Sequence, residues 1–308
     1  MNIVQSISKY DKKQPIAITI GTFDGVHIGH KKIVNRLISN AKELGLVPTV
    51  LTFFPHPRMV LQKDAEIKLL NTIEERGVIL EQLGLEQLII HPFTMDFSRL
   101  SATEFVRDLL VNQLHTKKII IGYDHRFGRN RNANITDLRA FGTTFNFDVE
   151  EIPAQEINEV SVSSTKIRRA LEEGNITTAN KYLGYNYMLT GVVKKGKGLG
   201  RQIQFPTANI KIEEKYKLIP KNGVYVVQST IGGKRISGMM NIGFNPTVEG
   251  KEQSIEVHFF DFNQDLYEQK IQIDILGWIR EEKKFESLDA LKEQLVLDKE
   301  ISLQLIAK

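Results

Sequence analysis

Hydrophobic residues in the first half of the chain form short runs, and the stretches between them carry apolar residues at every third or fourth position. The runs predict buried strands, and the stretches predict amphipathic helices. We expect strands at residues 16–20, 49–54, 87–91, 118–121 and 147–152, and helices at residues 31–44, 72–83 and from 101 onward. Strands that alternate with helices predict an α/β fold with a parallel sheet covered on both faces. Ligands of such sheets bind beyond the carboxyl ends of the strands.

Polar residues mark where two of these helices begin. Thr72 or Asn71 is the expected cap of the helix at residues 72–83. Ser101, followed three residues later by Glu104, predicts a capping box.

The pattern changes near residues 182–187, and strand-like runs dominate from there. Turns such as Asn222-Gly223 and Gly232-Gly233 separate several runs, which predicts an antiparallel barrel or sandwich. The expected strands are residues 187–193, 223–229, 238–242, 254–260 and 270–279, and Ser287 is expected to cap a final helix. We therefore expect one domain at residues 1–183 and a second at residues 184–308, joined through the short helical stretch 174–183.

Composition fits a soluble globular protein with two domains, because 41% of the 308 residues are hydrophobic and 25% are charged. No apolar run reaches the ~18 residues that span a bilayer, and residues 1–13 lack the apolar core of a signal peptide. The absence of cysteine excludes disulfides, a thiolate nucleophile and Cys-ligated zinc. We expect a cytoplasmic protein with no membrane partner.

The net charge of +4 is mild for a chain of this length. It is compatible with small anionic substrates and gives little support for nucleic-acid binding, which favours concentrated basic faces. The local basic cluster of Arg126, Arg129 and Arg131 fits a small phosphate ligand or a solvated surface better than RNA. We expect no nucleic-acid partner.

The turn after the first predicted strand, Gly21–His30, carries glycines at positions 21, 25 and 29 and two histidines, His27 and His30. A helix N-terminus is a natural phosphate site, and glycines let a ligand approach the backbone closely. Imidazolium or neutral N–H donors here would stabilise charge on a five-coordinate α-phosphorus. A metal site would need further ligands that are not obvious, and a purely structural capping role stays open.

Three further segments carry candidate chemistry. Pro55-His56-Pro57 pins the backbone around His56, which also suits a rigid surface turn. The loop Gly122–Gly128 combines a carboxylate, cations and an aromatic face that suit a base or a flavin-like ring, or a solvated loop. Ser163–Arg168 opens a helix with hydroxyls, backbone N–H groups and an arginine, which predicts a phosphate cradle or an ordinary N-cap.

The second half contains a glycine loop, Gly196–Arg201, that matches neither the Rossmann fingerprint nor the P-loop. Thr207 and Asn209 follow it and offer hard oxygen ligands suited to Mg²⁺, although Asn209 also fits a plain turn. Period-two alternation places Glu256 and His258 on one face of a strand. A carboxylate there could take a proton from a hydroxyl, or it could simply face solvent.

Together these motifs resemble the bacterial bifunctional riboflavin kinase/FMN adenylyltransferases, also called FAD synthetases. The resemblance covers nearly the whole chain. Its matched segments are residues 21–30, 55–57, 122–128, 163–168, 198–209, 223–225, 241–247, 256–262 and 280–285.

The resemblance implies a fold of the α/β plus β kind. The N-terminal part would be a Rossmann-like nucleotidyltransferase domain with a parallel sheet, and the C-terminal part an antiparallel riboflavin-kinase barrel with a terminal helix. Its catalytic residues would be Glu256 as the general base, and His27 and His30 as stabilisers of the transferred adenylyl phosphate.

The resemblance also implies binding residues. ATP or its phosphates would be bound by Gly21, Phe23, Asp24, His56, Ser163, Ser164, Thr165, Arg168, Gly196, Gly198, Gly200 and Arg201. The flavin would be bound by Asp124, Arg126, Phe127 and Arg280. Thr207 and Asn209 would organise Mg²⁺, with ATP as the co-substrate.

The implied chemistry has two steps. The 5′-hydroxyl of riboflavin, deprotonated by Glu256, attacks the γ-phosphorus of ATP to give FMN and ADP. An FMN phosphate oxygen then attacks the α-phosphorus of a second ATP to give FAD and pyrophosphate. The oligomeric state stays open, with a weak homo-oligomer allowed.

The chain departs from the family pattern at three places. Gln204 and Glu268 stand where glycine is usual, and residues 130–134 replace a more glycine-rich stretch. These changes bear on substrate affinity and loop motion more than on reaction type.

Three other functions were weighed: an enzyme with one active domain, a nucleotide- or flavin-binding regulatory module without turnover, and a tRNA-charging enzyme. The combination of His27, His30, Thr207, Asn209 and Glu256 argues against the first two, because binding alone does not require all of them. The lack of an anticodon-binding region or an extended basic face disfavours the third.

Overall fold

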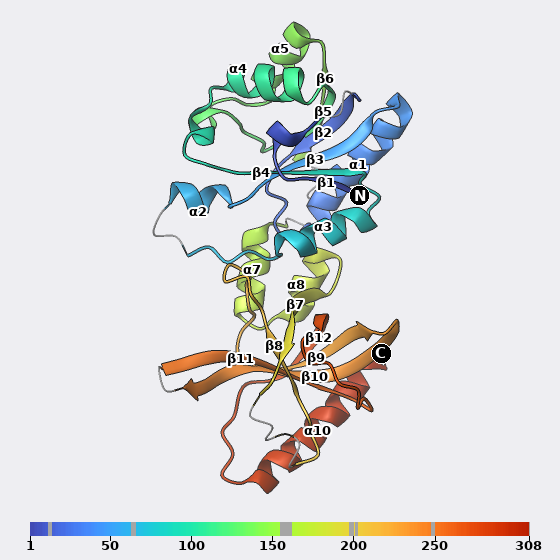
Figure 1. The fold of residues 1–308 in the computed structure, drawn as a ribbon, viewed down its shortest axis with the longest axis vertical. Helices are drawn as coiled ribbons and strands as arrows, with labels where there is room; N and C mark the ends of the chain where they lie inside the picture. The colour runs from blue at the N-terminus through green and yellow to red at the C-terminus, as the bar shows by residue number, and fades with distance from the viewer. Residues whose placement is uncertain are drawn as a thin grey trace. The chain divides into compact units, whose positions relative to one another are not determined.

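The computed structural model describes residues 1–11, 14–62, 66–154, 162–196, 200, 203–247 and 250–307, and Figure 1 shows the chain as a ribbon. The chain divides into two compact units, Met1–Ser163 and Ser164–Lys308. We call them the first and the second unit. Each is built around its own sheet. Among the described residues, no helix is long and apolar enough to cross a membrane.

The first unit contains a six-stranded sheet in the order β1-β4-β3-β2-β5-β6, and every neighbouring pair of strands is parallel. The predicted parallel sheet is therefore confirmed. Its strands are β1 (Asn2–Val4), β2 (Ile16–Ile20), β3 (Val47–Phe53), β4 (Gln87–His91), β5 (Thr116–Gly122) and β6 (Asp148–Ile152). The sequence analysis did not predict β1, which is three residues long and pairs with β4 at the edge of the sheet.

Helical segments cover the sheet, as the alternating pattern predicted. They are η1 (Ile7–Lys9), α1 (Ile28–Leu44), α2 (Pro57–Leu61), α3 (Ile73–Gln82), η2 (Phe97–Arg99), α4 (Ala102–Glu104), the π-helical η3 (Phe105–Gln113), η4 (Arg129–Arg131) and α5 (Ile135–Phe145). One face of the sheet packs its alternate isoleucines against apolar side chains of η3 and α5. Helix α1 packs on β2, β3 and β5.

Capping explains where these helices begin. Thr72 caps α3 and shares a capping box with Glu75, so Thr72 rather than Asn71 is the cap. The predicted box of Ser101 and Glu104 is confirmed at α4. Helix α5 was missed, although Asn134 and Asp137 form the same kind of box there.

The strand order reverses between β2 and β5. From β2 the chain moves through β3 to β4 on one side of the sheet, and later through β5 to β6 on the other. In parallel sheets the crevice at such a switch point, beyond the carboxyl ends of the strands, is the usual ligand site. The loops after β2, β3 and β5 all lie at this edge.

The second unit contains a closed barrel in the order β10-β11-β8-β7-β12-β9, with antiparallel pairing throughout. This confirms the barrel of the two predicted alternatives. Its strands are β7 (Tyr187–Lys194), β8 (Ala208–Lys211), β9 (Gly223–Ile231), β10 (Lys234–Thr247), β11 (Gly250–Phe259) and β12 (Lys270–Arg280). Strand β8 was not predicted, and β10 is longer than the expected residues 238–242.

The described part of the second unit also contains the helices α7 (Ser164–Glu172), α8 (Ile176–Leu183) and α10 (Leu288–Ile306). Helix α8 packs on β7 and β12. Helix α10 packs on β9, β10 and β12. Ser287 caps α10 through its side chain, as predicted.

Candidate active sites

The first candidate site is the turn between β2 and α1, and its backbone is strained. Phe23 has a φ of 47°, Gly25 of 86° and Val26 of 32°. A positive φ is a true outlier for a β-branched residue such as Val26, and it persists only where the surroundings hold it. Strain of this kind clusters at functional sites, and here it lies at the switch point of the sheet.

The two histidines of this turn, which we call the histidine pair, lie against each other. His27 is the N-cap of α1, and its Nδ1 accepts a hydrogen bond of 3.4 Å from the backbone N–H of His30. The two rings stack with centroids 3.7 Å apart and planes inclined by 16°. Because Nδ1 of His27 is an acceptor, a neutral ring carries its proton on Nε2, where it can be donated to a ligand.

The surroundings keep the histidine pair uncharged near neutral pH. Burial lowers the pKa of His27 to about 4, although the carboxylates of Asp24 and Asp124 oppose the shift. Burial also lowers the pKa of His30 well below its usual value, with the like charges of His27 and Arg76 acting in the same direction. Of the imidazolium and neutral forms considered from the sequence, the structure favours neutral donors.

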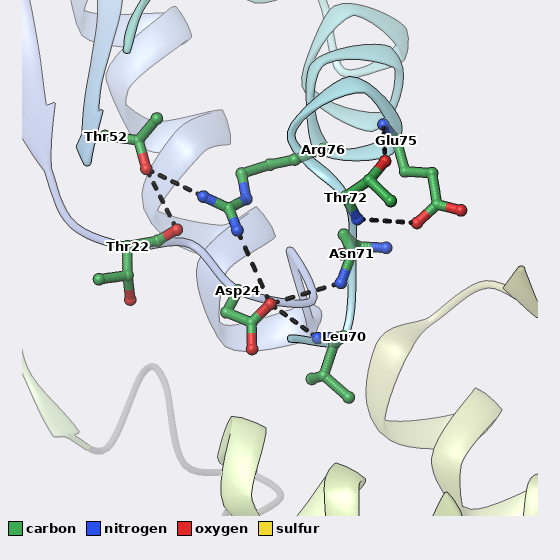
Figure 2. A network of polar contacts seen from close by, with 8 residues as sticks. All are labelled: Thr22, Asp24, Thr52, Leu70, Asn71, Thr72, Glu75 and Arg76. Atoms are coloured by element: carbon green, nitrogen blue, oxygen red, sulfur yellow. Dashed lines mark hydrogen bonds and ion pairs between the residues drawn. The ribbon is translucent and has the colours of Figure 1, made fainter. Parts of the chain in front are cut away.

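Asp24 belongs to this turn and points into the protein interior, with 1% of its surface exposed. Its Oδ1 accepts backbone hydrogen bonds from Leu70 at 2.9 Å and from Asn71 at 3.4 Å, and it faces the guanidinium of Arg76 (Figure 2). Its contact with ATP stays a prediction. The sequence analysis did not single out Arg76, because a charged residue in a helix usually faces solvent.

Gly21 and Phe23 support the histidine pair from within the turn. A Cβ at Gly21 would lie 3.0 Å from the ring of Phe23, so the glycine lets that ring pack against the backbone. The Phe23 ring in turn lies 5.1 Å from the ring of His30. The predicted phosphate contacts of both residues stay predictions.

The loops after β3 and β5 bring further predicted residues to the same edge. His56 caps α2, and its Nδ1 accepts from the backbone of Arg58 at 3.2 Å, which again leaves Nε2 as the donor of a neutral ring. Asp124 and Arg126 are exposed. Phe127 is 7% exposed and packs in the core beside Phe105, with ring centroids 6.1 Å apart.

The predicted phosphate cradle Ser163–Arg168 spans the boundary of the two units. Ser163 ends the first unit, and Ser164 is the first residue of α7. Thr165 is exposed and Arg168 is half-buried on the first turns of that helix. The hydroxyl-bearing helix start predicted from the sequence is therefore present.

The second candidate site lies on the barrel, where β8 pairs with β11. Asn209 and Glu256 are direct partners across these strands. The hydroxyl of Thr207 donates a 3.2 Å hydrogen bond to Oε2 of Glu256. A hydroxyl directly before β8, an amide oxygen on β8 and a carboxylate on β11 are thus gathered at one place.

His258 contacts the segment that precedes β8 in this site. Its Nδ1 donates to the backbone carbonyl of Pro206 at 2.8 Å, and its ring packs 5.0 Å from Phe205. Burial lowers its pKa. His258 therefore anchors the segment that carries Thr207, a role the sequence did not reveal although alternation placed it beside Glu256.

The glycine loop approaches the same residues. A side chain at Gly196 would collide with the amide of Asn209, and one at Gly200 would collide with the carbonyl of Phe205. The amide of Phe205 also donates to Gly200 at 2.8 Å, which closes the turn. The predicted residues Gly198 and Arg201 lie outside the described residues.

Arg280, predicted to contact flavin, is tied to the terminal helix. Its Nε donates to Asp298 Oδ1 at 2.9 Å, and its Nη2 donates to Oδ2 at 2.7 Å. Asp298 is fully buried and also accepts from Gln294 at 3.0 Å. Arg280 therefore fastens α10 to the end of β12, and its flavin contact stays a prediction.

Residues at the three expected departures from the family pattern have positive φ angles. Gln204 has a φ of 67° and Glu268 of 62°, while Asn130 in the substituted stretch has a φ of 56°. These values lie in the left-handed region that glycine adopts without strain. At these positions the chain adopts a backbone that glycine would adopt without strain.

The donor set of the second site suits a hard cation. Among the described residues, no cluster of three or more His, Cys, Asp or Glu side chains could hold a metal ion. Thr207, Asn209 and Glu256 supply oxygens only, which is the chemistry of a metal that shares its coordination sphere with substrate phosphates. The residues present therefore fit a divalent metal that binds together with ATP.

Comparison with known proteins matches two family models to the chain, one in each half. The FAD synthetase family model matches residues 9–166, and the riboflavin kinase family model matches residues 183–306. The bifunctional riboflavin kinase/FMN adenylyltransferase of Buchnera aphidicola is 37% identical over 98% of this chain and 97% of its own length. The Listeria monocytogenes protein of the same name is 37% identical over 94% of this chain and 92% of its own.

A solved structure from Streptococcus pneumoniae, described as a macrolide-efflux protein, shares the fold with a TM-score of 0.88 and 31% identity over 97% of both chains. The first family model covers the histidine pair, and the second covers Thr207, Asn209 and Glu256. The chain therefore belongs to the family of bifunctional riboflavin kinase/FMN adenylyltransferases.

Proposed function

We propose that this protein makes FAD from riboflavin in two ATP-dependent steps, with a riboflavin kinase in the barrel and an FMN adenylyltransferase in the parallel-sheet unit. The observation that carries the proposal is the contact of Glu256 with Thr207 and with Asn209, its partner across β8 and β11, in a chain that also carries a stacked histidine pair. The functional boundary is proposed between residues 183 and 184, at the start of the segment that the riboflavin kinase model matches.

In the first step, Glu256 takes the proton of the riboflavin 5′-hydroxyl. The hydroxyl oxygen then bonds to the γ-phosphorus of ATP, and the bond from that phosphorus to the β,γ-bridging oxygen breaks to release ADP. Thr207 holds Oε2 of Glu256, so the carboxylate is oriented before the substrate arrives. Gly196 and Gly200 let the loop backbone approach the ATP phosphates.

In the second step, a phosphate oxygen of FMN bonds to the α-phosphorus of ATP, and pyrophosphate leaves. This nucleophile is already anionic and needs no strong base. Neutral Nε2–H donors of His27 and His30 would stabilise the charge that builds on the α-phosphoryl oxygens. Gly21, Phe23, Asp24, His56, Ser163, Ser164, Thr165 and Arg168 would complete the ATP site, and Asp124, Arg126 and Phe127 the FMN site.

The metal is proposed to be Mg²⁺, held by Thr207 and Asn209 beside Glu256. Mg²⁺ supplies charge neutralisation of the polyphosphate when it is bound. We further propose that the protein works in the cytoplasm on small molecules, without a nucleic-acid or membrane partner, as a monomer or a weak homo-oligomer.

The test is chromatography of flavins after the full chain is incubated with ATP and MgCl₂. Riboflavin is expected to give FMN and FAD, with one ADP for each molecule of FMN plus FAD. Supplied FMN is expected to give FAD with one pyrophosphate per FAD. EDTA should stop the first reaction, and Ca²⁺ in place of Mg²⁺ tests the metal. Riboflavin that stays unphosphorylated would overturn the kinase assignment, and FMN that stays unadenylated would overturn the other.

A further inference from the structure

Arg76 is a buried cation that the proposed reaction does not use. It lies on the first turns of α3 with 1% of its surface exposed. Its Nη1 donates to the hydroxyl of Thr52 at 3.2 Å, and that hydroxyl donates to the backbone carbonyl of Thr22 at 3.2 Å. Its Nη2 lies 3.7 Å from Oδ1 of Asp24, as Figure 2 shows. One guanidinium thus reaches the catalytic turn at two points, Thr22 and Asp24.

The two points lie within and beside the strained segment of that turn. Asp24 stands between Phe23 and Val26, which both have positive φ angles. The same carboxylate accepts backbone hydrogen bonds from Leu70 and Asn71, just before the capping box of Thr72. A strained backbone needs surroundings that hold it, and buried charge pairs hold geometry tightly because either partner alone is costly to bury.

We propose that Arg76 is a positioning residue of the adenylyl-transfer site, which clamps the strained turn through Asp24 and Thr52 so that His27 and His30 face the α-phosphate. This proposal rests on the proposed function of the first site. Arg76 touches no reacting atom, and it acts through the turn that carries the histidines.

Asp24 and Arg76 also determine the charge around the histidine pair. Asp24 and Asp124 face His27 with negative charge, whereas His27 and Arg76 face His30 with positive charge. Removing Arg76 would raise the pKa of His30 and leave Asp24 uncompensated beside His27. Removing the charge of Asp24 would lower the pKa of His27 instead. Opposite responses of the His27 pKa to the two substitutions would show that both charges act on the histidine pair, which a role in folding alone does not require.

Arg76→Lys, Arg76→Met and Asp24→Asn in the full chain test the proposal. Arg76→Lys keeps the charge and loses the planar fork, and we expect kcat for FAD formation from FMN to fall roughly 10- to 100-fold, because small misplacements of catalytic groups cost about that much. Riboflavin phosphorylation by the same samples should be unchanged. Arg139→Met, which removes an exposed partner of Glu151, is the matched control and should change neither activity.

Histidine titration by NMR gives the second readout, with His27→Gln and His30→Gln assigning the signals. The His27 pKa is expected to rise in Arg76→Met and to fall in Asp24→Asn. If Arg76→Met does not fold, Arg76→Lys alone decides the proposal through its kcat. Full FAD formation by Arg76→Lys with unmoved histidine titrations in the variants that fold would overturn it. An unmodified chain that makes no FAD from FMN would instead overturn the proposed function.

Discussion

The two candidate sites use opposite kinds of support. In the first unit the reacting groups lie on a strained turn, where His27 is buried, His30 is half-buried and the ion pair of Asp24 and Arg76 is buried. In the second unit they lie on regular antiparallel strands, where Glu256 is half-buried and Thr207 is exposed. A pleated strand already aims alternate side chains to one side, whereas a turn has to be held in shape.

This difference matches the demands of the two proposed steps. The riboflavin hydroxyl must lose a proton, so the second unit needs one carboxylate that solvent and substrate can reach. The phosphate of FMN is already an anion, so the first unit needs fixed donors aimed at developing charge. Low-dielectric surroundings strengthen such donors, and burial of the histidine pair provides them.

The largest effect is expected from a substitution in the barrel site. Glu256→Gln removes the proposed base but keeps an acceptor for the Thr207 hydroxyl, so kcat for FMN formation should fall about 10²- to 10⁴-fold. FAD formation from supplied FMN should be unchanged, which makes the second activity the internal control. FMN formation at the native rate, measured by flavin chromatography, would show that Glu256 is not the base.

The corresponding substitution in the first unit replaces a histidine of the turn. His30→Ala removes a neutral donor, and kcat for FAD formation should fall about 10²- to 10³-fold, the usual cost of one fixed donor to developing charge. Riboflavin phosphorylation should continue at its normal rate. If FAD formation and riboflavin phosphorylation were both lost, the substitution would have unfolded the chain rather than removed one catalytic group.

The sequence predicted both folds well because each depends on local periodicity. Buried strands and amphipathic helices were correct along most of the first unit, and the barrel was one of two predicted alternatives. The errors have physical causes. Strand β1 has only three residues and β8 only four, so neither shows the usual run of apolar residues.

The supports of the sites were harder to predict than their reacting groups. His27, His30, Thr207 and Glu256 lie in compact motifs, and the residues around them narrow their chemistry. Arg76 and Asp24 are far apart in the chain, as are Arg280 and Asp298, and their pairing depends on tertiary packing. Only the structure shows that these charges are buried together.

Acid should lower the free energy of unfolding of the first unit more than that of the second. The pKa of His27 is about 4 in the folded chain, below its value of about 6.5 in an unfolded chain, so unfolding takes up a proton between these pH values. Its contribution is fully present above pH ~6.5, and about 3 kcal/mol is lost as the pH falls to ~4. Burial also lowers the pKa of His125 in the same unit to about 4, which adds to the loss.

Calorimetry can follow this loss, with the fluorescence of the single tryptophan, Trp278, identifying the barrel transition. The unfolding transition that leaves the Trp278 fluorescence unchanged belongs to the first unit. Its free energy of unfolding should fall more steeply between pH 6.5 and 4 than that of the barrel. His27→Gln should make that slope shallower. An unchanged slope in this variant would show that His27 is not held neutral by burial.

The smallest expected effect concerns the strained barrel loop. Gln204 is exposed with a φ of 67°, and a left-handed conformation costs a side-chain-bearing residue about 1–2 kcal/mol, against about 0.5–1 kcal/mol for the extra chain entropy of glycine. Gln204→Gly should therefore stabilise the barrel by roughly 0.5 kcal/mol, measured by Trp278 fluorescence in urea. Gln204→Ala keeps the strain and should change little.

Glu268→Gly provides the contrast within the same barrel. Glu268 has a similar φ of 62°, but its carboxylate also pairs with Lys194 at 2.7 Å. An exposed pair of this kind contributes about 0–1 kcal/mol, so its loss should offset the relief of strain and leave stability nearly unchanged. Equal stabilisation by the two glycine substitutions would show that the Lys194 pair adds nothing. Destabilisation by Gln204→Gly would show that its side chain, and not only its backbone, holds the loop.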